Sequence, residues 1–254
     1  MKRLLTIEWL KVRNYRTFHV YIGLYILLIL AVYAGFDSFK INGPIDLSVV
    51  YKFPNVWYYA AYVSTWFAAI PALLMINLVC NEISYRTMRQ HIIDGMSRVD
   101  YLKGKLILAG AISMLTGILV LLIGSLFGIL KGPSTSILDG IGEISYVLRA
   151  MWVSFGIMTA AIFIAIVVKR SALSILFFLL LYWIIEPIIG NMWLTDIYPY
   201  LPFNSLDEFI TSPFQLKSIS FGKTSTPWDV TLAGIIYPLL FIAGSYHQLT
   251  KKDL

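Results

Sequence analysis

Six long apolar stretches, separated by shorter polar segments, dominate the pattern of the chain. Each comes close to the roughly 20 apolar residues that a helix needs to cross the hydrocarbon core of a bilayer. Because every backbone polar group in lipid must be satisfied internally, we expect these stretches to be helices. They cover about 18–36, 58–80, 106–130, 146–168, 172–190 and 230–246. The pattern predicts an all-α, polytopic membrane protein with six transmembrane helices in a single domain, residues 1–254.

The composition of the 254-residue chain agrees with this pattern. Hydrophobic residues make up 58% of it and Asp, Glu, Lys and Arg only 13%, about half the charged share of an average globular protein. Too few charged side chains remain to cover the surface of a water-soluble protein. We therefore exclude a soluble enzyme, a disordered regulator and a nucleic-acid-binding module, and expect membrane lipids to surround the chain.

The distribution of basic residues predicts the orientation. Of the 20 Lys and Arg residues, 14 lie in residues 1–17, 81–105, 169–170 and 249–254, which fall on one side of the predicted membrane. Insertion strongly favours basic loops in the cytoplasm. We therefore expect a multi-pass protein of the plasma (inner) membrane with both termini in the cytoplasm.

The polar segment between the second and third stretches has a helical period. On a helical wheel, four apolar residues fall within about 80° of one another, and polar residues occupy the other side. The four are Tyr85, Met88, Ile92 and Met96. The pattern predicts an amphipathic helix over residues 81–98. Such a helix either lies on the bilayer surface, where basic residues meet headgroups, or docks into a groove of a cytoplasmic partner, and periodicity alone leaves both open.

The same segment contains an ordered motif. Its parts are Asn81-Glu82, Arg86-Thr87, Ile92-Ile93-Asp94-Gly95, Ser97-Arg98 and, opening the next stretch, Gly104-Lys105. This order resembles the cytoplasmic motif of the permeases of ABC-2-type transporters. The run Glu8-Trp9-Leu10-Lys11 also resembles the cytoplasmic segment that precedes their first span. Arg86 departs from the family pattern, because many members have glycine there.

The resemblance implies the ABC-2 (type V exporter-like) architecture and a permease subunit that forms the translocation pathway of an ATP-driven exporter. Residues 81–98 would be the coupling helix, seated in a cleft of a separate ATP-binding cassette (ABC) subunit. The implied contact residues are Glu82, Tyr85, Arg86, Thr87, Met88, Arg89, Ile92, Met96 and Arg98. Two ATPase subunits would serve two permease subunits, which form a homodimer or a heterodimer.

The chain has no nucleotide-binding motif of its own. A phosphate-binding loop requires GxxxxGK[ST], but Val99 stands at the first glycine position before Gly104-Lys105, and Leu106 follows the lysine. A single cysteine, Cys80, and three scattered histidines give no metal-ligand spacing. We therefore expect a non-catalytic subunit without cofactor or metal, with ATP and magnesium bound by the partner ATPase.

Two charged residues lie inside the apolar stretches, Glu186 and Arg149. Charge within a bilayer is costly and indicates a functional role by default, so both are candidate pathway residues. The alternatives are that Glu186 ends its helix and sits among headgroups, that it pairs with Arg149, or that Arg149 reaches the headgroups by itself. Pro187 is expected to bend or end the helix. For the outer loop, residues 191–227, the resemblance implies short re-entrant helices.

Three other features concern helix shape and packing. Pro71 and Pro238 predict kinks in the second and sixth stretches. Gly124 and Gly128 allow another helix to come close to the third, within the chain or in a dimer.

Two other functional classes remain open from the residues alone. A non-transporting membrane subunit could use an ABC ATPase for signalling or lipid extraction. A membrane-embedded enzyme would need a catalytic constellation at membrane depth, for which Glu186 is the candidate acid. The sequence does not identify a substrate.

Overall fold

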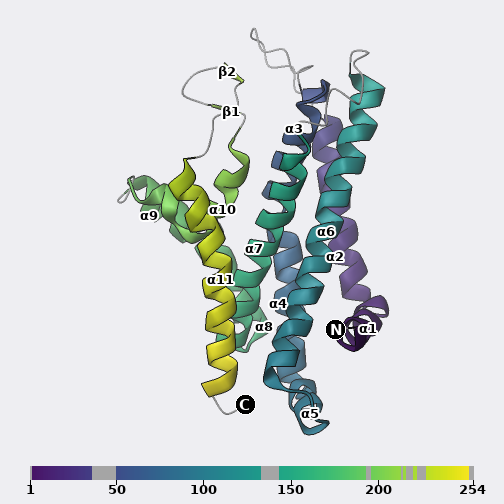
Figure 1. Ribbon diagram of the computed structural model, residues 1–254, viewed down its shortest axis with the longest axis vertical. Helices are drawn as coiled ribbons and strands as arrows, with labels where there is room; N and C mark the ends of the chain where they lie inside the picture. The colour runs from purple at the N-terminus through teal and green to yellow at the C-terminus, as the bar shows by residue number, and fades with distance from the viewer. Residues whose placement is uncertain are drawn as a thin grey trace.

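The protein is a bundle of long helices packed side by side (Figure 1). The computed structural model describes residues 2–35, 50–132, 143–192, 196–212, 214–215, 220–221 and 227–251. Its α-helices are α1 (Lys2–Arg13), α2 (Arg16–Gly35), α3 (Val56–Trp66), α4 (Ala69–Ser84), α5 (Thr87–Ile93), α6 (Arg98–Lys131), α7 (Ser145–Val168), α8 (Ser171–Leu179), α9 (Glu186–Met192), α10 (Pro202–Asp207) and α11 (Trp228–Lys251).

Shorter elements complete the described structure. A π-helical segment, Leu180–Ile185, joins α8 to α9, and 3-10 turns lie at Tyr198–Tyr200 and Glu208–Ile210. Two two-residue strands, β1 (Phe214–Gln215) and β2 (Ser220–Phe221), form an antiparallel pair with Phe214 opposite Phe221. The all-α prediction is therefore confirmed for every described element except this small pair.

Five of the six predicted apolar stretches correspond to a helix long and apolar enough to cross a membrane, and the sixth does so if a bent pair of helices is counted as one span. Five are continuous: α2, α6, α7, the run Ser171–Ile189 and α11. The sixth is the pair α3 and α4, bent by 43°, and Figure 1 shows α4 continuing the course of α3 along the bundle. Two helices extend past the predicted stretches: α6 begins at Arg98, and α11 ends at Lys251.

Pro71 accounts for the bend between α3 and α4. A proline has no N–H for the carbonyl four residues earlier, and its ring crowds that carbonyl. Here that carbonyl belongs to Phe67, at the break, and it accepts a hydrogen bond from the amide of Ile70 instead, at 2.9 Å. The predicted kink in the second stretch is thus confirmed. Helix α11 runs through Pro238 without a break.

Helix α7 lies at the centre of the bundle and packs against α4, α6 and α11. In the half of α6 away from α5, Gly124 faces α3 and Gly128 faces the turn before α3. A Cβ atom at Gly124 would lie 2.6 Å from the Trp57 side chain, and one at Gly128 would lie 2.7 Å from the Phe53 ring. Such small residues let helices approach closely in membranes. These two glycines therefore allow close packing within the chain, which is one of the two alternatives left open by the sequence.

The two ends of the bundle differ. Helices α1 and α5 and the last turn of α11 lie together at one end, which also holds both termini (Figure 1); we call it the α5 end. The pair β1–β2 and the start of α3 lie at the opposite end. Of the loop predicted over residues 191–227, the structure describes 191–192, 196–212, 214–215, 220–221 and 227. Its helix α10 packs against α7 and α11.

Candidate functional site

At the α5 end, the structure corrects the single helix predicted for residues 81–98. Helix α4 continues to Ser84, Arg86 has a left-handed backbone (φ 58°), and α5 follows as a separate helix. Gly95, with φ 92°, reverses the chain after α5, a conformation that glycine adopts without steric cost. The Ser97 hydroxyl then accepts the amide of Asp100 at 3.0 Å and caps α6, as serine commonly does at a helix start.

The break changes which residues face outward. Met88 is 1% exposed and belongs to the hydrophobic core, and Ile92 and Met96 pack against that core. Tyr85 and Ile93, by contrast, are 77% and 83% exposed. Three of the four apolar residues expected to fill a partner's cleft therefore contact the chain itself, and Ile93 takes their place on the outer face. The side chain of Arg89 lies outside the described part of the chain.

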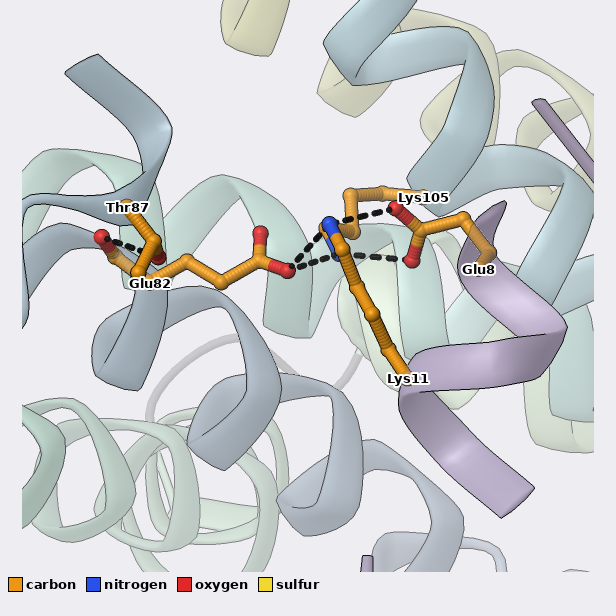
Figure 2. Close-up of polar contacts among 5 residues, drawn as sticks. All are labelled: Glu8, Lys11, Glu82, Thr87 and Lys105. Carbon is orange, nitrogen blue, oxygen red and sulfur yellow. Dashed lines mark hydrogen bonds and ion pairs between the residues drawn. The ribbon is translucent and has the colours of Figure 1, made fainter. Parts of the chain in front are cut away.

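Four charged residues meet just inside the α5 end (Figure 2). They are Glu8 and Lys11 of α1, Glu82 of α4 and Lys105 of α6, and we call them the charge cluster. The Lys105 amine lies 2.7 Å from Oε2 of Glu8 and 2.9 Å from Oε1 of Glu82. The cluster has no net formal charge, and it joins α1 to α4 and α6, which lie more than 50 residues further along the chain.

The geometry of the charge cluster suits a buried site. The Lys105 side chain is 1% exposed, and a buried charge is tolerated only when it is paired and hydrogen-bonded. Lys11 completes the arrangement at 3.0 Å from Glu82 and 3.2 Å from Glu8. Burial alone would lower the pKa of Lys11, but the carboxylates of Glu82 and Glu8 outweigh it and raise the pKa above its ordinary value. Lys11 is therefore held as a cation between the two carboxylates.

Other motif residues also bind within the chain. The Thr87 hydroxyl donates to the backbone carbonyl of Glu82 at 3.2 Å, which ties the start of α5 to α4. The Arg98 guanidinium donates to the carbonyls of Leu249 and Thr250 at 2.7 and 3.3 Å, where a cation complements the negative end of α11. Glu82 and Arg98, which the sequence analysis expected to contact a partner, thus bind groups within the chain itself.

The two intramembrane charges do not pair with each other. Glu186 is buried, and its two oxygens accept the amides of Asn204 at 2.6 Å and Phe203 at 3.2 Å. The Arg149 guanidinium donates to the carbonyl of Phe209 at 3.2 Å and lies 4.9 Å from the centre of the Tyr146 ring. The pair considered from the sequence is therefore absent, because each charge is engaged by backbone of one intervening segment.

That segment is α10 with the 3-10 turn that follows it. Glu186 binds the amides at its N-terminal end and Arg149 a carbonyl at its C-terminal end, so both charges complement the helix dipole. The helix that contains Glu186 does not end there, because α9 continues to Met192 after the π-helical segment. A π-helical turn before Pro187 fits a residue that cannot donate a backbone hydrogen bond.

Removing the Glu186 carboxylate is expected to destabilise α10 and the turn that follows it. In Glu186→Ala the amides of Phe203 and Asn204 lose their acceptors, and an unsatisfied buried donor costs about 1–3 kcal/mol. Chemical denaturation of the purified protein in micelles measures the change. Glu186→Gln keeps one acceptor oxygen and should lose less. Equal stability of Glu186→Ala and the parent would contradict the capping role.

Sequence reasoning missed the charge cluster although its members lay in the two motifs. Glu8 and Lys11 stand in the segment before the first span, Glu82 in the loop motif, and Lys105 at the opening of the third stretch. The sequence feature that could have predicted the cluster was the presence of acidic and basic residues at the ends of neighbouring apolar stretches. Among the described residues, no group of three or more His, Cys, Asp or Glu residues is arranged to hold a metal ion.

Comparison with known families gives an independent assignment. The model of the family described as ABC-2 family transporter protein matches residues 4–185, which is more than half of the chain. The match includes α5 and all four members of the charge cluster. A comparison with curated proteins gave no match. The chain therefore belongs to the ABC-2 transporter family, as a multi-pass membrane permease component of an ABC transporter.

Proposed function

We propose that this chain is the non-catalytic permease subunit of an ATP-driven exporter, and that α5 is its contact with a separate ABC ATPase. The observation that supports this most directly is the exposure of Tyr85 and Ile93 at the α5 end. A contiguous exposed apolar patch rimmed by polar residues marks an interaction surface, and we infer that Tyr85 and Ile93 contribute to such a patch outside the spans. The exposed neighbours Arg86 and Gln90 provide the polar rim that such a surface needs.

The connections of α5 provide a way to transmit movement into the membrane. Met88 fixes α5 in the core, and Thr87 holds it to α4. The charge cluster then links α4 to α6 and α1. A partner that displaces α5 would therefore displace α4 and α6 with it. ATP drives such a change only when the partner has different affinities for the two states of the permease.

Helix α1 suits the bilayer surface better than α5 does. Its Trp9 and Leu10 are more than half exposed, whereas Glu8 and Val12 are buried against the bundle. An amphipathic helix with exposed Trp and Leu next to basic residues is typical of the membrane–water interface. We infer that the surface role considered for residues 81–98 belongs to α1, with both termini on the cytoplasmic side. Two permease subunits, identical or different, would each bind one ATPase.

Replacing Ile93 with Asp is expected to weaken ATPase binding by at least tenfold. The side chain is 83% exposed, so the folded protein tolerates the charge, whereas burying it in an interface costs more than the roughly 1.4 kcal/mol that a tenfold change represents. The measurement is co-purification with, and affinity for, an ABC ATPase that co-purifies with the parent chain.

The matched control is Trp9→Asp, an exposed apolar residue at the same end of the bundle. It should leave ATPase affinity unchanged and weaken only the membrane contact of α1. Full ATPase binding by Ile93→Asp would refute the proposal for α5. Transport of a solute into vesicles by the complete complex separates an exporter from a subunit used for signalling or lipid extraction.

A further inference from the structure

A cavity of about 410 Å³ lies between α3, the π-helical segment with the start of α9, and α10 with the residues that follow it. These elements occupy the half of the bundle away from α5 (Figure 1). The volume falls within the range of about 300–1,000 Å³ that small-molecule sites occupy. Its distance from α5 and from the charge cluster makes it a separate feature of the molecule.

The cavity lies where the backbone is irregular. Helix α3 ends at the 43° bend, the facing wall includes the π-helical segment, and the third wall is the short helix α10. Irregular backbone at membrane depth is tolerated where it is buried in protein or lines a water-filled cavity, and π-helical turns occur frequently at functional sites. The helices are therefore interrupted at the place where a ligand could be held.

The walls are fixed by hydrogen bonds, so the cavity is formed before any ligand binds. The hydroxyl of Tyr58 donates to the carbonyl of Thr211 at 2.8 Å, and that of Tyr62 to the Ser212 hydroxyl at 3.0 Å. Both bonds join α3 to the segment after α10. Small-molecule sites are usually preformed in this way.

Aromatic and acidic side chains face the cavity together. Tyr62, Trp66 and Trp183 provide aromatic surface, and Asp207 and Glu208 provide carboxyl groups. No Lys or Arg occurs in its described lining. Aromatic faces and carboxylates both attract cations. The lining therefore favours a positively charged ligand and disfavours an anion.

Asp207 is the acidic group at the inner wall. The Tyr182 hydroxyl lies 3.3 Å from its Oδ2 atom. Burial disfavours the ionised form of an uncompensated carboxylate. A cation beside Asp207 would stabilise its ionised form. The Nδ2 atom of Asn204 is also buried here without a partner in the described structure, and it could donate to a ligand acceptor.

We propose that this cavity binds an organic cation, an amine or quaternary ammonium group attached to an aromatic or other apolar body. Trp66 and Trp183 would contact the apolar body and the cation by cation–π attraction, and Asp207 would pair with the charge. The role of this cavity as a substrate subsite rests on the proposed transport function, whereas the binding does not require the ATPase.

The test uses the purified full-length chain in neutral detergent micelles and benzyltrimethylammonium as the probe. Isothermal titration calorimetry should show saturable binding of the probe and none of benzenesulfonate, an anion of similar size. Asp207→Asn should lower the affinity at least tenfold. Trp183→Leu should lower it at least threefold, since its half-exposed side chain can change without unfolding the protein. Asp196→Asn, an exposed acid outside the cavity, is the matched control and should bind like the parent.

Three results would overturn the proposal: no saturable binding of the cation, equal binding of the sulfonate, or unchanged affinity in both Asp207→Asn and Trp183→Leu. If Asp207→Asn does not fold, unchanged affinity in Trp183→Leu is sufficient to overturn it. Ile93→Asp should bind the probe with the affinity of the parent. A failure at α5 and a failure at this cavity are therefore distinguishable.

Discussion

Lys105→Met is expected to destabilise the protein by about 3–5 kcal/mol, the cost of removing one partner from a buried ion pair. The Lys105 amine lies within 2.9 Å of carboxylate oxygens of both Glu8 and Glu82. Without it, Lys11 is the one cation that these two carboxylates keep among the described side chains, and it lies at the more exposed edge of the cluster. We expect α1 to detach from α6, so that the loss is visible both in chemical denaturation in micelles and as faster proteolysis of α1.

The chain provides a close control for this substitution. Lys103 lies on the same helix two residues away, but its side chain is exposed, so Lys103→Met should change stability by less than about 0.5 kcal/mol. A double variant that combines Glu82→Gln with Lys105→Met removes one carboxylate along with the amine and should recover part of the loss. Equal stability of the Lys105 and Lys103 variants would show that the cluster does not hold the helices together.

The positions of the spans could be predicted because lipid imposes a simple requirement on sequence. Any crossing helix needs a long apolar stretch with its backbone bonded internally, and all six stretches were visible. The charge cluster could not be predicted in the same way. Lys105 and Glu8 are 97 residues apart, and their contact depends on how α1 lies against α6, which no local pattern determines.

The error at residues 81–98 has a specific physical cause. A helical wheel assumes an unbroken period, but the left-handed backbone at Arg86 ends that period after α4. Tyr85 and Met88, which share a face on the wheel, therefore point to solvent and to the core respectively. The position of the break decides which side chains of this motif face outward and which face the core.

The hydrogen-bond partners of Glu186 could not be predicted from the sequence for a related reason. Sequence reasoning sought a side chain of opposite charge and found Arg149. In the structure both charges bind backbone atoms at opposite ends of α10 and its turn. Peptide groups at helix ends carry partial charges, but a sequence does not show which helix end will lie beside which side chain.

Met88→Asp is expected to destabilise the protein by at least about 3 kcal/mol, because an ionised carboxylate at that site would be buried without a partner. Met88 is 1% exposed and packs in the core that also contains Val12, Tyr101 and Leu249. Any loss of ATPase binding in this variant would follow from unfolding of α5. Denaturation in micelles, measured in the absence of the ATPase, detects the change directly.

Ile93→Asp is the matched control, since it places the same charge five residues further along the chain on an exposed position. It should keep the stability of the parent and lose ATPase binding, whereas Met88→Asp should lose stability first. If Met88→Asp folded normally and lost only ATPase binding, Met88 would have to face a partner and the packing of α5 against the core would be wrong. Because both residues lie at α5, the two variants separate the proposed contact with the ATPase from the packing that attaches α5 to the core.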